Sequence, residues 1–286
     1  MTAEPCGDPP VPPGPLMGAS PGARLTLSAG KRDLVLRTPF TNAAGFLGCD
    51  GAARQATDFA GLGAYVTPPL SLKPRSPANG PRLLPYPGGF LLHTGHPNPG
   101  LRAAVRRERH HWALLPCPVI VHLLVQGPED AREAARWLES VDEIGGLEIG
   151  LGEVDERRAS ALVTASIGEV PLIAHLSLGT AVSVFVAAVE AGAQAVSIGA
   201  PRGALPGPDG APVCGRLYGP AVFPLGLQTV VQLKDQLKVP IIAGGGVYRR
   251  EQAGALLLAG AAAVQLDGVL WTTPEKVSPA LRSEVS

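Results

Sequence analysis

The sequence predicts a (β/α)8 barrel, and three observations carry that prediction. Eight short apolar segments recur along the chain with helical patterns between most of them, as expected for a parallel sheet covered by helices. The chain has 286 residues, which suits a barrel of about 250 residues. The glycine turn Gly244–Gly246 follows an apolar segment and precedes an Ala/Leu-rich helix. In such barrels the loops after strands seven and eight hold phosphate groups, so this turn predicts a phosphate site.

The first residues differ in composition from the rest. Residues 1–24 are rich in proline and glycine, and we expect a disordered tail there. Residues 25–286 are expected to form one barrel domain. Two apolar triplets, Leu25–Leu27 and Leu34–Leu36, flank a polar turn, which predicts a small β-hairpin at the floor of the barrel.

The remaining elements follow in order. The predicted barrel strands are 40–44, 64–67, 119–124, 146–149, 171–176, 195–198, 240–243 and 263–266. The predicted helices are 129–140, 155–167, 180–191, 224–237 and 249–259. Long Gly/Pro-rich loops, 68–100 and 199–220, follow strands two and six, on the side where a barrel carries its active site. An open doubly wound sheet is the alternative, but no GxGxxG opens the first βα unit.

Composition excludes several classes of partner. The 24 basic and 24 acidic residues balance, so nothing indicates a nucleic-acid partner. The four cysteines form no CxxC pair and no zinc-ligand spacing, which favours reduced thiols in a cytoplasmic protein without a metal site. No signal peptide and no apolar run of membrane-spanning length is expected, and so no membrane partner.

Four stretches together resemble the dihydroorotate dehydrogenase family. They are the segments 38–45, 74–100, 215–221 and 244–247, within a resemblance that extends from about Leu25 to Trp271. Segment 38–45 is similar to the family's first strand and flavin-facing turn, and segment 215–221 to its Gly-Gly-x-Ser-Gly-x-Ala sequence. The resemblance implies FMN at the barrel mouth, a small-molecule substrate, oxidation of dihydroorotate or a related molecule with hydride transfer to flavin, and a possible homodimer.

The resemblance also implies which positions meet the cofactor and the substrate. The implied FMN contacts are Ala43, Ala44, Gly45, Thr67, His175, Gly219, Gly244, Gly245, Gly246 and Gly268. His175 stands where the family has a lysine near the flavin, and a protonated histidine replaces part of that charge. Asn98, in the loop after strand two, is the implied substrate contact.

Several polar positions of the family are changed here. Pro68 follows Thr67 where the family has lysine, and Gly150 and Asp155 stand where it has asparagines. Asp267, after strand eight, places a negative charge beside the expected phosphate. A buried donor that loses its partner costs about 1–3 kcal/mol, so these changes keep a second hypothesis open: a non-catalytic barrel descended from the family. A phosphate-binding barrel of unrelated chemistry is a third.

The sequence offers three candidates for the catalytic group, namely Glu153, His175 and His93. Each follows a predicted strand at the barrel mouth, and each has a plain alternative as an exposed or hydrogen-bonded side chain. Glu148 lies inside strand four, where a carboxylate needs a partner, so we expect it to be paired within the barrel.

Overall fold

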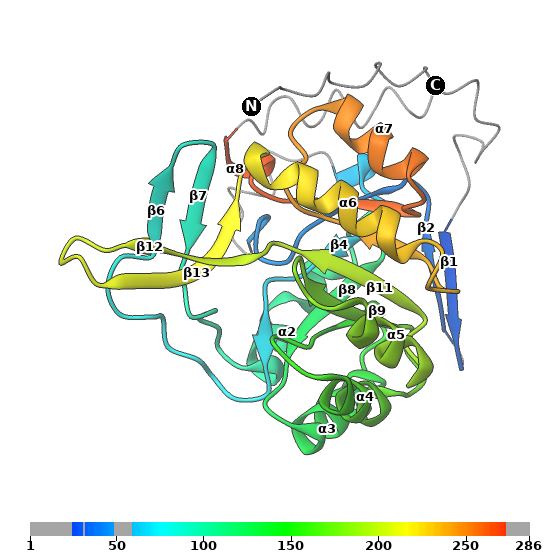
Figure 1. Cartoon of the computed structure of the whole chain (residues 1–286). Coiled ribbons are helices and arrows are strands. Elements are labelled where there is room, and N and C mark those ends of the chain that lie inside the picture. The colour runs from blue at the N-terminus through cyan, green and yellow to red at the C-terminus, as the bar shows by residue number, and fades with distance from the viewer. Residues whose placement is uncertain (1–24, 31, 49–58, 273–286) are drawn as a thin grey trace, which may run out of the picture.

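The computed structural model describes residues 25–30, 32–48 and 59–272 (Figure 1). The predicted tail over residues 1–24 lies outside the described residues, as do Cys6 and Cys49.

Eight parallel strands form the barrel, which confirms the predicted fold. They are β3 (Phe40–Asn42), β4 (Tyr65–Val66), β8 (Val119–Leu124), β9 (Ile144–Gly150), β10 (Leu172–Ser177), β11 (Ala195–Gly199), β14 (Ile241–Ala243) and β15 (Ala263–Leu266). Their spatial order is β3-β15-β14-β11-β10-β9-β8-β4. The barrel closes between β3 and β4 through a parallel bridge from Thr41 to Ala64. The buried amide of Asn42 adds hydrogen bonds to the backbone N–H and C=O of Val66, at 2.8 and 2.7 Å.

Helices cover the outside of the barrel. They are α2 (Leu101–Trp112), α3 (Pro128–Leu138), α4 (Glu156–Ser166), α5 (Val182–Glu190), α6 (Phe223–Leu233), α7 (Arg250–Leu258) and the short α8 (Val269–Thr272). Helix α4 packs between α3 and α5 (Figure 1). The Asp155 carboxylate caps α4 by accepting from the Arg158 N–H at 2.8 Å, which is the usual function of an N-terminal Asp. Within the described residues, no helix combines the length and apolarity needed to cross a bilayer.

The predicted hairpin closes the floor of the barrel. Strands β1 (Leu25–Ala29) and β2 (Arg32–Leu36) pair antiparallel. Leu34 and Leu36 are buried in one cluster with apolar residues from the barrel strands. Arg32 donates to the carbonyls of Val141 and Ile144 at 2.8 and 2.9 Å, which fixes the hairpin beneath β9.

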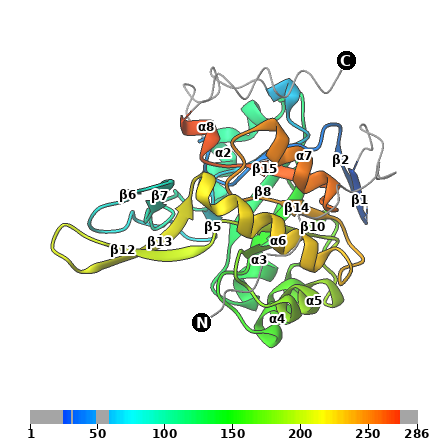
Figure 2. The ribbon, with the colours of Figure 1, turned by 45° about the horizontal axis from the view of Figure 1, so that its top comes forward.

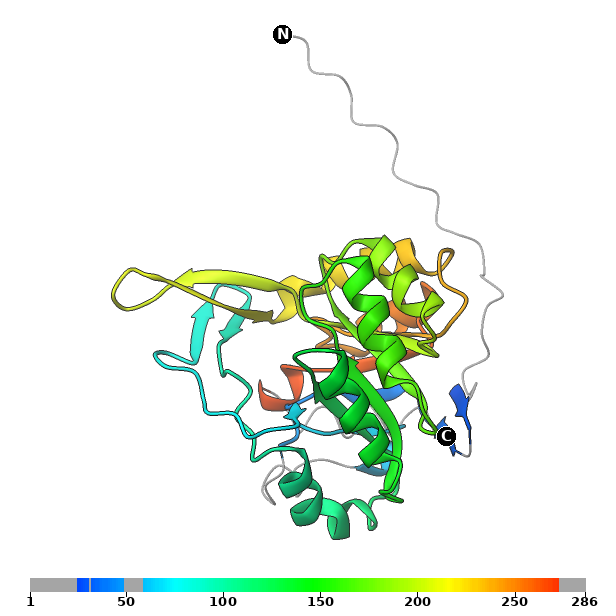
Figure 3. The ribbon, with the colours of Figure 1, turned by 90° about the horizontal axis from the view of Figure 1, so that it is seen from below.

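The two long Gly/Pro-rich segments form a sheet that the sequence did not predict. Its strands are β6 (Leu83–Tyr86), β7 (Gly89–Leu92), β12 (Arg202–Pro206) and β13 (Pro212–Tyr218), in the order β12-β13-β7-β6. A further short strand, β5 (Leu70–Ser71), pairs with β8. The antiparallel sheet projects from the side of the barrel (Figures 2 and 3). Each segment supplies one hairpin, and the two hairpins join into one sheet where β13 pairs antiparallel with β7.

Side chains inside the barrel lie in three layers, because alternate residues of each strand face inward. The lowest layer is apolar and contains Ile120, Ile173, Ala195, Ile242 and Ala263. The middle layer is polar and contains His122, Glu148, His175, Ser197 and Gln265. The layer at the mouth contains Gly150, Gly199 and Gly244 together with Leu124 and Asp267. The missing side chains of these glycines leave room above the polar layer.

Candidate functional site

A cavity of about 230 Å³ opens at the C-terminal ends of the barrel strands. His122, His175 and Gln265 of the polar layer form part of its lining. An outer cavity of about 420 Å³ adjoins it on the side of the projecting sheet, and the two share Ala44 and Arg216 in their walls. The carboxyl ends of parallel strands are where barrels of this type carry their sites.

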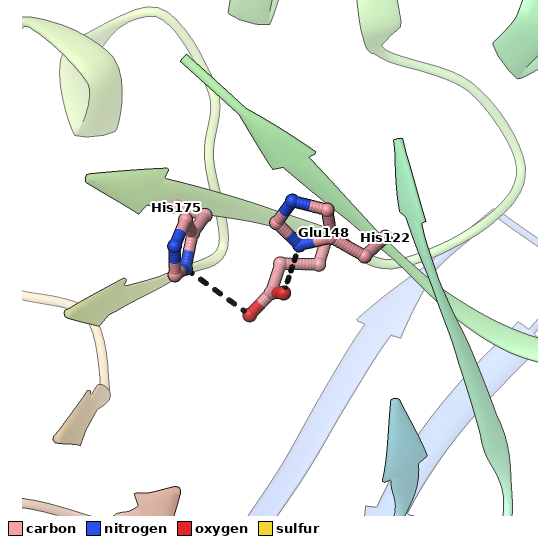
Figure 4. Close-up of side chains that lie close together, drawn as sticks. All are labelled: His122, Glu148 and His175. Atoms are coloured by element: carbon pink, nitrogen blue, oxygen red, sulfur yellow. Dashed lines mark hydrogen bonds and ion pairs between the residues drawn. The ribbon is translucent and has the colours of Figure 1, made fainter. Parts of the chain in front are cut away.

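Glu148 is the centre of the polar layer. Its side chain is 1% exposed, and it lies between His122 and His175 from the two neighbouring strands (Figure 4). One carboxylate oxygen is 2.5 Å from His122 Nδ1. The other accepts from Ser197 Oγ at 2.6 Å and from Gln265 Nε2 at 2.9 Å. The expectation that Glu148 is paired within the barrel is therefore met by three donors.

These hydrogen bonds fix the tautomers of both histidines. An ionised carboxylate only accepts, so His122 Nδ1 carries the proton that it donates to Glu148. The single Ser197 hydroxyl proton goes to Glu148 as well, so Ser197 Oγ accepts from His175 Nδ1 at 2.9 Å. In both rings the unprotonated nitrogen is then Nε2. Among the described residues neither Nε2 has a hydrogen-bond partner, and both rings line the cavity.

Burial and the contacts with histidine shift the pKa of Glu148 in opposite directions. Burial would raise the pKa of the Glu148 carboxyl, but its contacts with His175 and His122 more than offset burial and hold the pKa well below its usual value. Burial lowers the pKa of His175 in spite of the nearby carboxylate. The site therefore holds an ionised carboxylate and a neutral imidazole with a free lone pair, which is the state a proton acceptor requires.

The same three side chains are a possible ligand set for a metal ion. Their ligand atoms lie within 4.8 Å of one another. However, hydrogen bonds already satisfy both Nδ1 atoms and both oxygens of Glu148. We therefore describe the cluster as a proton-binding network.

Three arginines surround the cavity. Arg75, Arg202 and Arg216 line both the inner and the outer cavity. Arg216 is held in place because its Nη1 donates to Ser177 Oγ at 2.7 Å and to the Ala200 carbonyl at 2.9 Å. Guanidinium groups bind carboxylates and phosphates through paired hydrogen bonds, so the rim of the cavity favours an anionic ligand.

The rim also has a strained histidine. His96 is the only described non-glycine residue with positive φ, at 53°. Burial, followed by repulsion from His122 and Arg216, lowers the pKa of His96 to about 4. His96 lines both cavities and is neutral near pH 7, so it adds a polar group but no charge.

The glycine turn after β14 faces a carboxylate. Asp267, at the end of β15, accepts from the Gly246 N–H at 3.2 Å and from the Gly268 N–H at 2.6 Å. Burial raises the pKa of Asp267 to about 6, against the hydrogen bonds from Gly246 and Gly268, which lower it.

The residues implied as flavin contacts divide into three groups. Those that line the cavities are Ala43, Ala44, Gly45, His175, Gly244 and Gly245. Gly246 and Gly268 lie behind them and donate to Asp267. Thr67 and Gly219 line neither cavity. Thr67 Oγ1 accepts from the His122 N–H and so supports β8, and Gly219, with φ of 134°, lies against Gly88 and Gly89.

Two of the catalytic and substrate candidates line a cavity and two do not. His175 lies in the polar layer, and His93 lines only the outer cavity. Glu153 lies outside both cavities, 74% exposed, and pairs with Arg202 at 3.1 Å. Asn98 is buried in the loop after β4, where its amide bonds Ser71, His96 and Gly100.

Sequence reasoning did not select His122, Ser197, Gln265 or the cavity arginines as site residues. The period-two alternation of Val119–Leu124 places His122 on the same face as Ile120, which would have pointed it into the barrel. The arginines carried no such signal, because the pairing of β13 with β7 is what places Arg216 over the cavity.

Fold and site together define a (β/α)8 barrel with a ligand cavity at the strand ends, a buried histidine–carboxylate cluster beneath it and arginines on its rim. Comparison with known proteins narrows the class. A family model described as dihydroorotate dehydrogenase matches residues 207–285. The chain is similar to the dihydroorotate dehydrogenase B (NAD(+)) catalytic subunit of Pelobacter propionicus, with 31% identity over 265 residues, covering 84% of this chain and 86% of the relative.

Two further relatives carry the same description. That of Trichlorobacter lovleyi is 31% identical over 277 residues, covering 88% of each chain. That of Geotalea daltonii is 32% identical over 269 residues, covering 85% of this chain and 87% of the relative. The chain belongs to the dihydroorotate dehydrogenase family. This membership confirms the predicted family and FMN as the family's cofactor.

The inner end of the cavity fits a flavin ring. Gln265 is one of its lining residues, and its buried Oε1 has no hydrogen-bond partner among the described residues, so the side chain has an acceptor left over for a ring N–H. Ala44, Gly244 and Gly245 provide small residues and backbone against which a flat ring can lie. The phosphate end differs, because Asp267 already binds two N–H groups of the expected phosphate site.

Proposed function

We propose that this chain is the catalytic subunit of an FMN-dependent oxidoreductase that oxidises dihydroorotate or a related small carboxylate. The observation that carries the proposal is the cavity itself, which combines the rings of His122 and His175 on its floor with three arginines on its rim. A substrate with one acidic C–H and one carboxylate matches that combination of groups.

The residues of the chain have separate tasks in this reaction. Arg216 and its neighbours bind the substrate carboxylate and set the orientation of the ring. The Nε2 of His175 or His122 takes the proton from one carbon, and Glu148 stabilises the imidazolium that forms. Loss of that proton, together with a hydride from the adjacent carbon, leaves a carbon–carbon double bond. Bound FMN supplies the hydride acceptor.

Gln265 would hold the flavin ring from the barrel side, and Ala44, Gly244 and Gly245 would lie against it. The lysine that the family places near the flavin is replaced by His175, which is neutral near pH 7. A positive group near the ring then comes from Arg216 on β13. The relatives are named as catalytic subunits, which supports a partner subunit that carries electrons onward.

The test is anaerobic mixing of the flavin-loaded protein with dihydroorotate while the flavin absorbance near 450 nm is recorded. We expect bleaching, and we expect Arg216→Ala to raise the substrate concentration for half-maximal rate by about 10- to 100-fold through the lost charged hydrogen bonds. Arg136→Ala, an exposed change on α3, is the matched control. Flavin that stays oxidised with dihydroorotate and with related small carboxylates would refute the proposal.

A further inference from the structure

The backbone N–H groups at the expected phosphate site of the barrel already donate to a carboxylate of the chain itself. The turn Gly244–Gly246 follows β14, Asp267 and Gly268 follow β15, and the short helix α8 begins at Val269. In (β/α)8 barrels these two loops and a short extra helix form the phosphate site. Here Asp267 binds the N–H groups of Gly246 and Gly268.

The carboxylate is part of a tightly packed region. Asp267 is 2% exposed. A Cβ at Gly246 would lie 2.5 Å from the Phe223 nitrogen, and one at Gly268 would clash with the Tyr248 hydroxyl. The chain itself therefore fills the space around the turn. Asp267 also lines the inner cavity, on the side from which a ligand would approach the two N–H groups.

No described cation pairs with Asp267. The titratable groups near it are the phenols of Tyr86, Tyr218 and Tyr248, from β6, β13 and the loop before α7; burial raises the pKa of each, and the negative charge of Asp267 adds to that increase. A phosphate that entered this place would meet a carboxylate without a compensating charge. A phosphate monoester carries about −1.5 to −2 at pH 7, so the two anions would repel each other.

We propose that Asp267 is an internal substitute for the flavin phosphate. Its carboxylate binds the N–H groups of Gly246 and Gly268, which a phosphate would otherwise bind. The chain therefore selects a flavin by its ring rather than by its phosphate. The proposal rests on the proposed flavin site at the barrel mouth. It adds that Asp267 determines specificity between FMN and its dephosphorylated form, riboflavin.

The test measures dissociation constants of FMN and riboflavin for the flavin-free protein at pH 8 by quenching of flavin fluorescence. For the unchanged chain we expect the two constants to agree within about threefold. Asp267→Asn keeps an oxygen acceptor and removes the charge, and we expect it to tighten FMN by about tenfold or more while riboflavin changes by less than about twofold. Asp33→Asn, an exposed change on the floor hairpin, is the matched control and should alter neither constant.

Asp267→Ser, which keeps a short hydroxyl acceptor, repeats the measurement if the Asn variant does not fold. FMN binding at least tenfold tighter than riboflavin in the unchanged chain, with no gain in either variant, would overturn the inference while leaving the proposed flavin site intact. Absence of binding of both flavins to the unchanged chain and to the variants would overturn the flavin site and the inference together.

Discussion

Two carboxylates, Glu148 and Asp267, are buried about equally inside one barrel, yet their pKa values are shifted in opposite directions. Glu148 is 1% exposed and its pKa lies well below the usual value. Asp267 is 2% exposed and its pKa is raised to about 6. Burial raises the pKa of both, so the difference comes from their neighbours.

The neighbours differ in chemistry and in origin. Glu148 receives hydrogen bonds from His122, Ser197 and Gln265, side chains on adjacent strands of the barrel. Within the described part of the chain, Asp267 accepts hydrogen bonds only from backbone N–H groups, those of Gly246 and Gly268. The first carboxylate therefore organises the proton-binding side of the cavity. The second occupies donors that would otherwise be available to a ligand.

The largest effect is expected from Glu148→Ala. The change leaves three buried donors without an acceptor, at about 1–3 kcal/mol for each group. We expect the free energy of unfolding in urea at pH 7 to fall by about 3–5 kcal/mol in total. Glu129→Ala, at a side chain that is 89% exposed, should change it by no more than about 0.5 kcal/mol. A loss below about 1 kcal/mol for Glu148→Ala would contradict the network described above.

The second effect concerns the two histidines that Glu148 orients. His175→Gln and His122→Gln each keep a polar side chain but remove the basic Nε2. Whichever histidine accepts the substrate proton should lose about 10²–10⁴ in kcat, with little change in KM. Stopped-flow rates of flavin reduction between pH 5 and 9 measure this. If neither variant slows reduction by tenfold, the proton acceptor lies elsewhere.

The third prediction concerns the pH dependence of the free energy of unfolding, to which Asp267 and Glu148 contribute with opposite signs. The pKa of Asp267 is 3.8 in the unfolded reference and about 6 when folded, so between these values the unfolded chain releases the proton first. The contribution of Asp267 to the free energy of unfolding therefore falls by about 3 kcal/mol as pH rises from about 4 to about 6, at 1.36 kcal/mol per pH unit. Above about pH 6 this contribution is constant. Glu148 has the opposite sign, because its lowered pKa adds stability that is lost as pH falls below about 4.5.

Asp267→Asn should remove the decline between pH 4 and 6. Urea unfolding of both proteins at pH 4.5 and pH 7.5 gives the difference directly. A parallel pH dependence in the two proteins would mean that Asp267 ionises as readily in the folded state as in the unfolded chain.

Much of the barrel was predictable because its strands are marked locally. The limits of β8 and β15 match the predicted 119–124 and 263–266 residue for residue. Both strands are buried on both faces, so their sequences are apolar except for one polar residue each, His122 and Gln265. The projecting sheet was not predictable, because β7 and β13 pair across 124 positions of sequence, as in Leu92 with Arg216, and each lies in a Gly/Pro-rich segment that indicates a loop.

The site was predictable where it depends on single positions. His175 lies near the C-terminal end of β10 and the glycine turn follows β14, and both contribute to the cavity lining. Contacts between side chains of different strands were not predictable, because they depend on strand order and register. The contact of His122 with Glu148 depends on the register of β8 against β9, in which the two residues are direct neighbours. The binding of Gly246 by Asp267 depends likewise on β14 lying beside β15.

The smallest effect is expected from Glu153→Gln. Glu153 pairs with Arg202 at 3.1 Å, but the two side chains are 74% and 47% exposed, and such surface pairs contribute about 0–1 kcal/mol. Since Glu153 also lies outside both cavities, its replacement should leave kcat for flavin reduction within about twofold and lower KM slightly, because Arg202 is no longer neutralised by a carboxylate. The measurement is repeated at low and high salt, because screening should abolish the small KM effect. A hundredfold loss of kcat would instead make Glu153 the proton acceptor and would require the loop after β9 to close over the cavity during turnover.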